Sequence, residues 1–439
     1  MGFDAEQYLR RLDSSRSEEI RGRVSGAVGL TLRAVLPGAF IGEQVEIRTP
    51  RRDPLPAEVV GFSEQSVVLM PLGDPEGIGP DAEVVPAGRP PAVLCGEALI
   101  GRVLDGLGRP MDDGGPLEGL TAWPIARPAP DPLTRRPVEQ ALPLGVRALD
   151  GPLTVGEGQR VGLFAPAGVG KSTLLAQIAR NTDAEVIVLA LVGERGREVR
   201  EFLEHTLGSA GRARSVVVCA TADSPALLRR RAAFVATSVA EYFREHDRRV
   251  LLLLDSLTRV ARAQREVGLA AGEPPVRRGF PPSAFALLPR LLERAGNSDR
   301  GTLTAIYTVL VEGADMDEPV ADEVRGILDG HVVLSRELAT RGRWPAIDLL
   351  TSVSRVFRQV ATPEQVGATE TLRALLGCYE RRRDLIALGA YEKGSDAQTD
   401  RALELIGPIE RYLSQQPEER STLEQARQDL IALLGGAAR

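Results

Sequence analysis

Residues 164–173, with the sequence FAPAGVGKST, combine the residue types that bind the phosphates of a nucleotide. Gly168 and Gly170 let backbone N–H groups turn toward an anion, and Lys171 supplies a cation at the start of an expected helix. The hydroxyl of Ser172 suits the Mg²⁺ that accompanies a nucleotide. We therefore predict a phosphate-binding loop made of Ala167, Gly168, Val169, Gly170, Lys171, Ser172 and Thr173.

The loop departs from the usual pattern G-x-x-x-x-G-K-[ST] at its first position, where this chain has Ala165. We expect Ala165 to end the preceding strand, ahead of the N–H groups that hold phosphate. A methyl group is acceptable there as long as φ is negative, and Pro166 stiffens the turn. The alternative, an ordinary glycine turn, is weakened by the strand and helix patterns on either side.

A carboxylate follows the aliphatic run 250–254, because Asp255 comes directly after it. In enzymes with a phosphate loop, a carboxylate at the end of a neighbouring strand orients Mg²⁺ or its water, since a hard cation prefers oxygen ligands. We predict that Asp255 and Ser172 serve the metal. The alternative is that Asp255 caps the next helix.

Hydrolysis also needs a group that orients and polarises water beside the terminal phosphate. Glu194 follows the expected strand 185–191 and is our candidate, with Glu198 and Glu201 as competitors. The charged residues from 194 to 204 also have the spacing of a solvated helix face, so residue chemistry alone leaves the three carboxylates open.

The elements that would position these groups alternate between strand and helix. We expect strands near 160–164, 185–191, 215–219, 250–254, 302–311 and 347–353. The last four are rich in β-branched residues and leucine, as strands buried on both faces of a parallel sheet are. The pattern predicts an α/β core at residues 93–362, entered through a proline-rich connector over 122–143.

The flanking segments have different patterns. Short alternating runs separated by turn residues predict a closed β-barrel at residues 21–92, and residues 4–12 predict one short helix within an N-terminal segment 1–20. Residues 363–439 have helical spacing and almost no strand signal, with a capping box at Ser421 and Glu424. Three zones therefore follow the N-terminal segment.

Composition limits the classes of function. The chain has 439 residues, 43% of them hydrophobic, and a net charge of −6, so no overall basic field favours nucleic acid. Its three cysteines, at 95, 219 and 378, are too far apart for a CxxC pair and are expected to be buried free thiols. The N-terminus lacks the apolar segment of a secretory signal, and the aliphatic run 250–254 is too short to span a bilayer. We expect a cytoplasmic protein.

Several segments in order resemble the export ATPases of type III secretion, which are relatives of the catalytic subunits of rotary ATP synthases. They are GRVLDGLGRPMD, FAPAGVGKSTLL, VGERGREVREFLE, LLLLDSLTRVARAQREVGLAAGEPP and RRGFPPSAFALLPRLLERAGN. The resemblance covers residues 21–400 and implies a hexameric ring whose subunits have an N-terminal β-barrel, a RecA-like P-loop NTPase core and a C-terminal α-helical domain. It also implies ATP as the substrate, with Mg²⁺.

The resemblance gives roles to residues that chemistry alone does not decide. Glu194 matches the catalytic carboxylate, and Arg195 beside it would support the phosphate network. Arg355 matches an arginine finger that a neighbouring subunit presents to the terminal phosphate, although a surface arginine is its plain alternative. Phe357 and Tyr379 are the candidates for packing against adenine.

The partners implied are chaperone–effector complexes, stator and central stalk proteins of the secretion apparatus, and the cytoplasmic face of the inner membrane as a peripheral site. The segment VLVEGADMDEPVADEV is similar to the host-injecting branch of the family, with the flagellar branch as the alternative. An RNA translocase built on the same ring would need stacking aromatics in the barrel, where residues 21–91 offer only Phe40 and Phe62. A non-catalytic ring subunit would lack the carboxylate that Glu194 supplies. We expect no specific nucleic acid partner.

Overall fold

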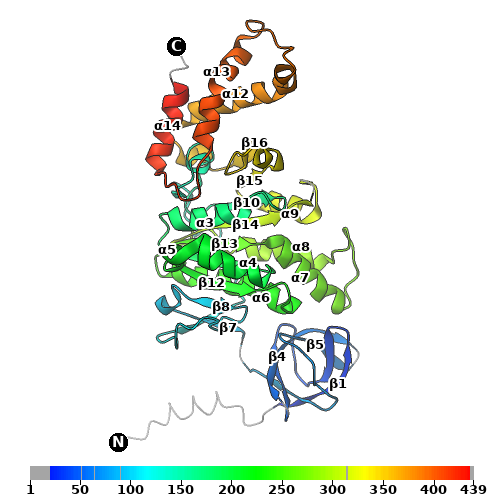
Figure 1. The fold of residues 1–439 in the computed structure, drawn as a ribbon. Coiled ribbons are helices and arrows are strands. Elements are labelled where there is room, and N and C mark those ends of the chain that lie inside the picture. Colours follow the sequence, from blue (N-terminus) through cyan, green and yellow to red (C-terminus); the bar gives the residue numbers. More distant parts are fainter. Residues whose placement is uncertain (1–19, 51, 64, 89, 313–314, 436–439) are drawn as a thin grey trace, which may run out of the picture. The chain divides into compact units, whose positions relative to one another are not determined.

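A computed structural model describes residues 20–50, 52–63, 65–88, 90–312 and 315–435 (Figure 1). The helix expected at residues 4–12 lies outside the described residues. The described chain divides into two compact units. One contains residues 20–91 with two short segments of later helices, and the other contains nearly all of the rest.

The first unit is a closed barrel of six strands. They are β1 (Gly22–Val28), β2 (Thr31–Val35), β3 (Gln44–Thr49), β4 (Arg52–Ser63), β5 (Ser66–Pro71) and β6 (Glu83–Pro86), joined in the order β1-β2-β5-β4-β3-β6. Alternate residues such as Val45, Ile47 and Leu69 point to the inside and are fully buried there. The barrel predicted from the alternating runs is confirmed.

The second unit is built on an eight-stranded sheet, with the strand order β16-β15-β10-β14-β13-β11-β12-β8. Its strands are β8 (Val103–Asp105), β10 (Arg160–Ala165), β11 (Val186–Val192), β12 (Ser215–Ala220), β13 (Arg249–Asp255), β14 (Thr302–Leu310), β15 (Gly330–Leu334) and β16 (Ile347–Ser354). All neighbours are parallel except β15 and β16. A separate two-stranded sheet pairs β7 (Ala92–Cys95) with β9 (Thr121–Pro124).

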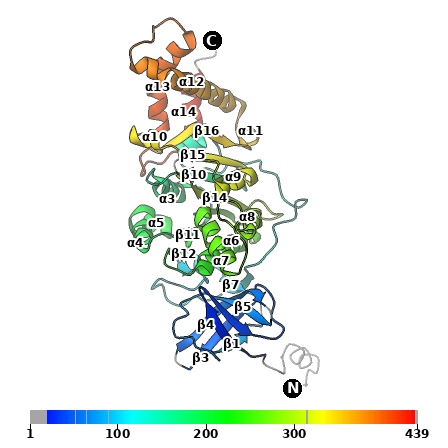
Figure 2. The ribbon, with the colours of Figure 1, turned by 90° about the vertical axis from the view of Figure 1, so that its right-hand side faces the viewer.

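Helices cover both faces of the large sheet (Figure 2). One face packs against α3 (Lys171–Asn181), the π-helical segment Phe202–Leu207 and the C-terminal helices. The other packs against α6 (Ala226–Glu245), α7 (Leu257–Ala270), α8 (Pro282–Leu292) and α9 (Pro319–Ile327). Five shorter helices complete this unit: α2 (Arg147–Asp150), α4 (Gly196–Glu201), α5 (Gly208–Arg212), α10 (Arg336–Thr340) and α11 (Phe357–Val360). A 3₁₀ turn covers Glu97–Leu99.

One strand differs from the sequence-based expectation. The run 347–353 was predicted to be buried on both faces of a parallel sheet, but β16 is an antiparallel edge strand. Its Leu350 and Val353 are 40% and 43% exposed. An aliphatic run predicts a strand, but it does not give the position of that strand in the sheet.

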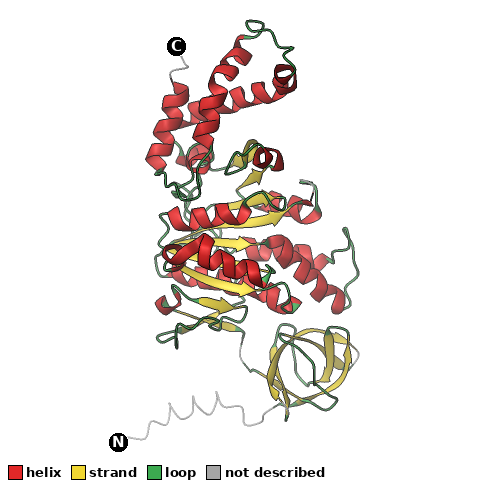
Figure 3. Cartoon of the chain, viewed as in Figure 1, coloured by secondary structure: helices red, strands yellow, loops and turns green. Residues whose placement is uncertain are grey.

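The described C-terminal part contains three helices joined by loops (Figure 3): α12 (Pro363–Ala387), α13 (Ala397–Leu413) and α14 (Leu423–Gly435). The capping box predicted at Ser421 and Glu424 is wrong by one residue. Gln425 N–H donates to Thr422 Oγ1 at 3.2 Å, and Thr422 N–H donates to Gln425 Oε1 at 3.1 Å. The reciprocal pair therefore lies one position later.

The chain between α13 and α14 attaches the helical part to the sheet. The guanidinium of Arg147 donates to Tyr412 O at 2.9 Å and also bonds Ser414 O and Glu419. Arg180, near the end of α3, donates to Pro417 O at 2.7 Å. The helix that begins at Lys171 therefore contacts this connection near its other end.

Candidate active site

The phosphate-binding residues predicted at 167–173 cover the turn after β10 and the first three residues of α3. Gly168 and Gly170 have φ of 79° and 78°, a left-handed conformation that side chains rarely adopt. A Cβ on Gly170 would also lie 2.7 Å from the ring of Trp344. Val169 is only 2% exposed and anchors the loop in the core. Glycine is thus required at Gly170 by both conformation and space.

Ala165 occupies the place that the sequence indicated. It is the last residue of β10, is fully buried, and pairs with Leu310 of β14 in the parallel ladder. Strand conformation has negative φ, so the methyl group is compatible with the loop that follows. The departure from the usual pattern therefore lies outside the turn.

Three charged side chains converge beside the loop, one from the start of α3, one from just after β11 and one from the end of β13. Lys171 Nζ donates a hydrogen bond to Asp255 Oδ1 and lies 3.5 Å from Glu194 Oε1. Their side chains are 12%, 4% and 13% exposed. Because β10, β11 and β13 are parallel members of one sheet, the residues that follow them meet at the same edge.

Glu194 has an environment unlike that of an ordinary surface carboxylate. Burial, and next the charge of Asp255, raise the pKa of Glu194, while Lys171 and Arg259 act in the opposite direction. Arg259 Nη1 lies 2.9 Å from Glu194 Oε2. Glu194 Oε1 is buried and accepts no hydrogen bond from the described residues. Such an oxygen can accept a proton or a water hydrogen close to the loop.

The competing carboxylates lie farther out. Glu198 is 40% exposed, and its Oε1 pairs with Arg195 Nη1 at 2.7 Å. Glu201 is exposed on α4. Of the three candidates, Glu194 is the one whose ion pairs in the described structure include Lys171. Arg195 itself has a side chain that is 80% exposed and faces Glu198, so this chain does not bring it to the loop.

Arg355 lies at the opposite end of the strands, where β10 begins. Its N–H donates to Asp329 O at 3.0 Å, and Nη2 donates to Arg325 O at 3.4 Å. Asp329 N–H in turn donates to Arg160 O, at the start of β10. The loop follows the end of that strand, about 17 Å away at about 3.3 Å per residue. Within one chain, Arg355 and Lys171 are therefore not brought together.

Two side chains beside the loop were missed by sequence reasoning. Arg259 lies in the first turn of α7, and its guanidinium pairs with Glu194. Trp344 is 40% exposed and its ring lies against Gly170. Of the two predicted adenine residues, Phe357 begins α11, and Tyr379 lies on α12 and packs against the core. Trp344 offers a flat apolar surface next to the phosphates.

The residues present fit a metal that is shared with a nucleotide. Ser172 is exposed in the first turn of α3, directly after Lys171, whose ammonium contacts Asp255 at the end of β13. Over the described ranges, no group of three or more histidine, cysteine, aspartate or glutamate side chains is gathered to hold a metal alone. Phosphate oxygens and water would have to complete the ligand shell, as is usual for Mg²⁺.

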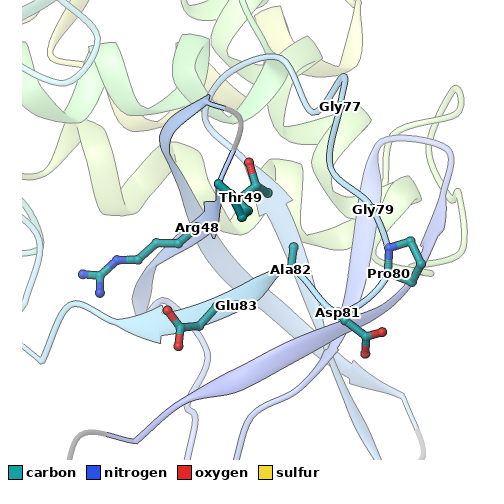
Figure 4. Close-up of a pocket in the computed structure, with 9 residues that line it drawn as sticks. Arg48, Thr49, Gly77, Gly79, Pro80, Asp81, Ala82 and Glu83 are labelled. Carbon is teal, nitrogen blue, oxygen red and sulfur yellow. The ribbon is translucent and has the colours of Figure 1, made fainter.

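The barrel contains an open pocket of about 520 Å³ lined in part by Arg48, Thr49, Asp81 and Glu83 (Figure 4). Its arginine and glutamate are engaged in ion pairs, Arg48 with Glu46 at 2.9 Å and Glu83 with Arg21 at 2.6 Å. The pocket therefore differs in chemistry from the phosphate loop.

The three cysteines have the environment that their spacing predicted. Cys95, Cys219 and Cys378 are buried free thiols. None of the helices in the described part of the chain is long and apolar enough to cross a bilayer.

Three family descriptions match the chain in order. They are the beta-barrel domain of the ATP synthase alpha/beta family at residues 24–88, its nucleotide-binding domain at 145–354, and the T3SS EscN ATPase C-terminal domain at 361–432. Among solved structures, the assembled ATPase EscN from the enteropathogenic E. coli type III secretion system matches with a TM-score of 0.88. It is 44% identical and covers 94% of this chain and 100% of that one.

Curated relatives agree with these matches. A type 3 secretion system ATPase of Xanthomonas euvesicatoria is 52% identical over 404 residues, 92% of this chain and 91% of the relative. A flagellum-specific ATP synthase of Bacillus subtilis (strain 168) is 47% identical over 416 residues, 94% of this chain and 95% of the relative. With a phosphate loop, an acidic strand end and a buried glutamate in one site, the chain belongs to the family of type 3 secretion system ATPases, close to the flagellum-specific enzymes.

Proposed function

We propose that this chain hydrolyses ATP at the junction between two copies of itself and thereby drives protein export. The observation that carries the proposal is that the charged groups are divided between the two ends of the parallel strands of one sheet. Lys171, Glu194 and Asp255 meet at the edge where the strands end, and Arg355 lies at the edge where β10 begins. A second copy would have to supply the finger.

In the proposed reaction, the amides of residues 168–172 and Lys171 hold the phosphates of ATP. Ser172 and Asp255 would hold Mg²⁺, which neutralises phosphate charge when it is bound. Glu194 orients the attacking water and accepts a proton from it. The buried position and raised pKa of Glu194 suit this role. Arg259, which contacts Glu194, would keep that carboxylate aimed at the phosphate.

The remaining roles follow from position and from the family. Arg355 of the adjacent copy would stabilise the charge of the transition state, an effect worth about 10³ to 10⁵ in rate in other phosphate-loop enzymes. Trp344 would stack on adenine, since its ring lies beside Gly170. Arg195 would join the phosphate network only if it left Glu198.

We further propose a homo-hexamer at the cytoplasmic face of the inner membrane. Relatives support part of this proposal, because EscN was solved assembled and also in complex with its central stalk EscO. Stator proteins and chaperone–effector complexes would be further partners, and export substrates would be released from chaperones and unfolded. The injecting branch is favoured by the segment 309–324, while relatives of both branches are similar to the chain. Our proposed domain limits are 21–92, 93–362 and 363–439.

The proposal is tested by measuring phosphate release per chain across a range of protein concentrations. Because the finger would come from a neighbour, specific activity should rise with concentration as subunits assemble, in parallel with the oligomeric state measured by light scattering. Equal specific activity in monomeric and assembled samples would contradict a shared site. Titration with single-stranded RNA is the control for a translocase, and RNA-stimulated turnover would contradict export as the function.

A further inference from the structure

Thr308 carries a buried hydroxyl on β14. This strand lies between β10, which leads into the phosphate loop, and β13, which ends at Asp255. Thr308 pairs with Leu163 of β10, and the preceding Tyr307 pairs with Leu254 of β13. Its side chain is fully buried. A buried hydroxyl needs a hydrogen-bond partner, so its partner indicates why it is there.

That partner is the carboxylate of the site. Thr308 Oγ1 donates to Asp255 Oδ1 at 2.7 Å, and the same oxygen accepts the hydrogen bond from Lys171 Nζ. Both donors bind Oδ1, so they hold the carboxylate through that oxygen. Oδ2 is then the oxygen that can serve a metal. A carboxylate held in this way keeps its direction when Lys171 turns toward phosphate.

The other buried threonine of this strand has a different task. Thr304 is 1% exposed, and its Oγ1 accepts a hydrogen bond from Gly158 N–H at 2.8 Å, away from the charged cluster. The two residues are thus a matched pair, with the same type, strand and burial. They differ in whether the hydroxyl contacts the site.

We infer that Thr308 is a positioning residue, which holds Asp255 in the orientation that receives the metal–nucleotide complex. The inference rests on the proposed function. Without the hydroxyl, Asp255 can rotate about its side-chain bonds and turn its free oxygen away from the metal. Residues that orient a metal ligand from behind typically contribute about 10- to 100-fold in affinity or activity.

The test compares Thr308→Val, which keeps the shape and removes the hydroxyl, with Thr308→Ser, which restores it, and with Thr304→Val as the control. Binding of a fluorescent ADP analogue to the full chain is titrated with Mg²⁺ and again with EDTA. We expect the dissociation constant with Mg²⁺ to rise about 10-fold or more in Thr308→Val and to remain unchanged in EDTA. Thr308→Ser should restore the Mg²⁺ effect, and Thr304→Val should leave it intact.

The inference is overturned if Thr308→Val keeps the wild-type ratio of the two constants, or if Thr304→Val loses it equally. Thermal melting of each variant shows that it is folded. Asp255→Asn separates the role of Thr308 from the proposed metal–nucleotide site. If Asp255→Asn loses the Mg²⁺ effect and Thr308→Val keeps it, the role of Thr308 is refuted and the proposed site stands. Wild-type binding that is indifferent to Mg²⁺ overturns both.

Discussion

A mixture of two inactive variants gives the sharpest test of a site shared between chains. In Arg355→Ala the finger is removed and the phosphate loop is intact, whereas in Lys171→Ala the loop is disabled and the finger is intact. Each variant alone should lose about 10³-fold or more in phosphate release, because every site lacks one of the two cations. Co-assembled rings should regain activity, since some junctions contain both.

The expected recovery follows from the geometry. Arg355 and the loop lie at opposite ends of β10, about 17 Å apart along the strand, which is farther than an arginine side chain extends. In a ring of head-to-tail contacts formed from a random equal mixture, about one junction in four joins the intact loop of one variant to the intact finger of the other. If sites work independently, the mixture should reach about a quarter of wild-type activity.

Phosphate release is measured after the two variants have been unfolded and refolded together, with co-assembly shown by differently tagged chains. Arg358→Ala is the matched control, because this arginine is 77% exposed and pairs with Glu370 on the surface. It should keep the wild-type rate. Wild-type activity in Arg355→Ala alone, or no recovery at all in verified mixed rings, would refute the reasoning.

Substitutions at three further positions test the site and its support. Glu194→Gln should bind nucleotide normally but release phosphate about 10²-fold more slowly or worse, as measured by single-turnover hydrolysis, and an unchanged rate would remove its catalytic role. Trp344→Ala should weaken ATP binding about 5-fold or more while Trp344→Phe preserves it in the same titration, because a stacked aromatic contributes about 1–3 kcal/mol per base. Burial raises the pKa of Asp150 to about 7, while hydrogen bonds from backbone N–H groups act to lower it. The native state therefore keeps a proton that the unfolded chain loses at about pH 4. The free energy of unfolding measured in urea should therefore fall as pH rises from about 4 to about 7, and a slope equally steep in Asp150→Asn would contradict this assignment.

The parts of the site that were predictable from sequence are those with a local requirement. A left-handed turn followed by a lysine and a hydroxyl at the start of a helix is specified within a few residues, so Gly168, Gly170, Lys171 and Ser172 could be identified by spacing alone. Asp255 was equally accessible, because a carboxylate directly after an aliphatic strand is well placed to serve the metal of such a loop. Residue chemistry left Glu194 as one of three choices, and the resemblance to the export ATPases singled it out. The structure adds its ion pair with Lys171.

What sequence reasoning missed depends on the path of the chain through space. Trp344 lies 174 positions after Gly170 and is brought to it by the non-sequential order of the sheet, in which β15 and β16 follow β10 at one side. Thr308 looked like one more β-branched residue of a buried strand, because periodicity cannot distinguish a structural hydroxyl from one that contacts a carboxylate. The edge position of β16 was hidden for the same reason.

The topology of the sheet explains why one copy of this chain does not bring Arg355 to its own phosphate loop. Parallel strands gather the residues that follow them at one edge, and Lys171, Glu194 and Asp255 all follow or end such strands. β16 runs in the opposite direction. The residue after it, Arg355, therefore lies at the end of the sheet where the parallel strands begin. With this strand order, the residue proposed as the arginine finger does not reach the phosphate loop of the same chain. In the proposed ring, head-to-tail contact between identical copies would bring Arg355 of one copy to the phosphate loop of the next, and closure of the ring would leave no loop without such a partner.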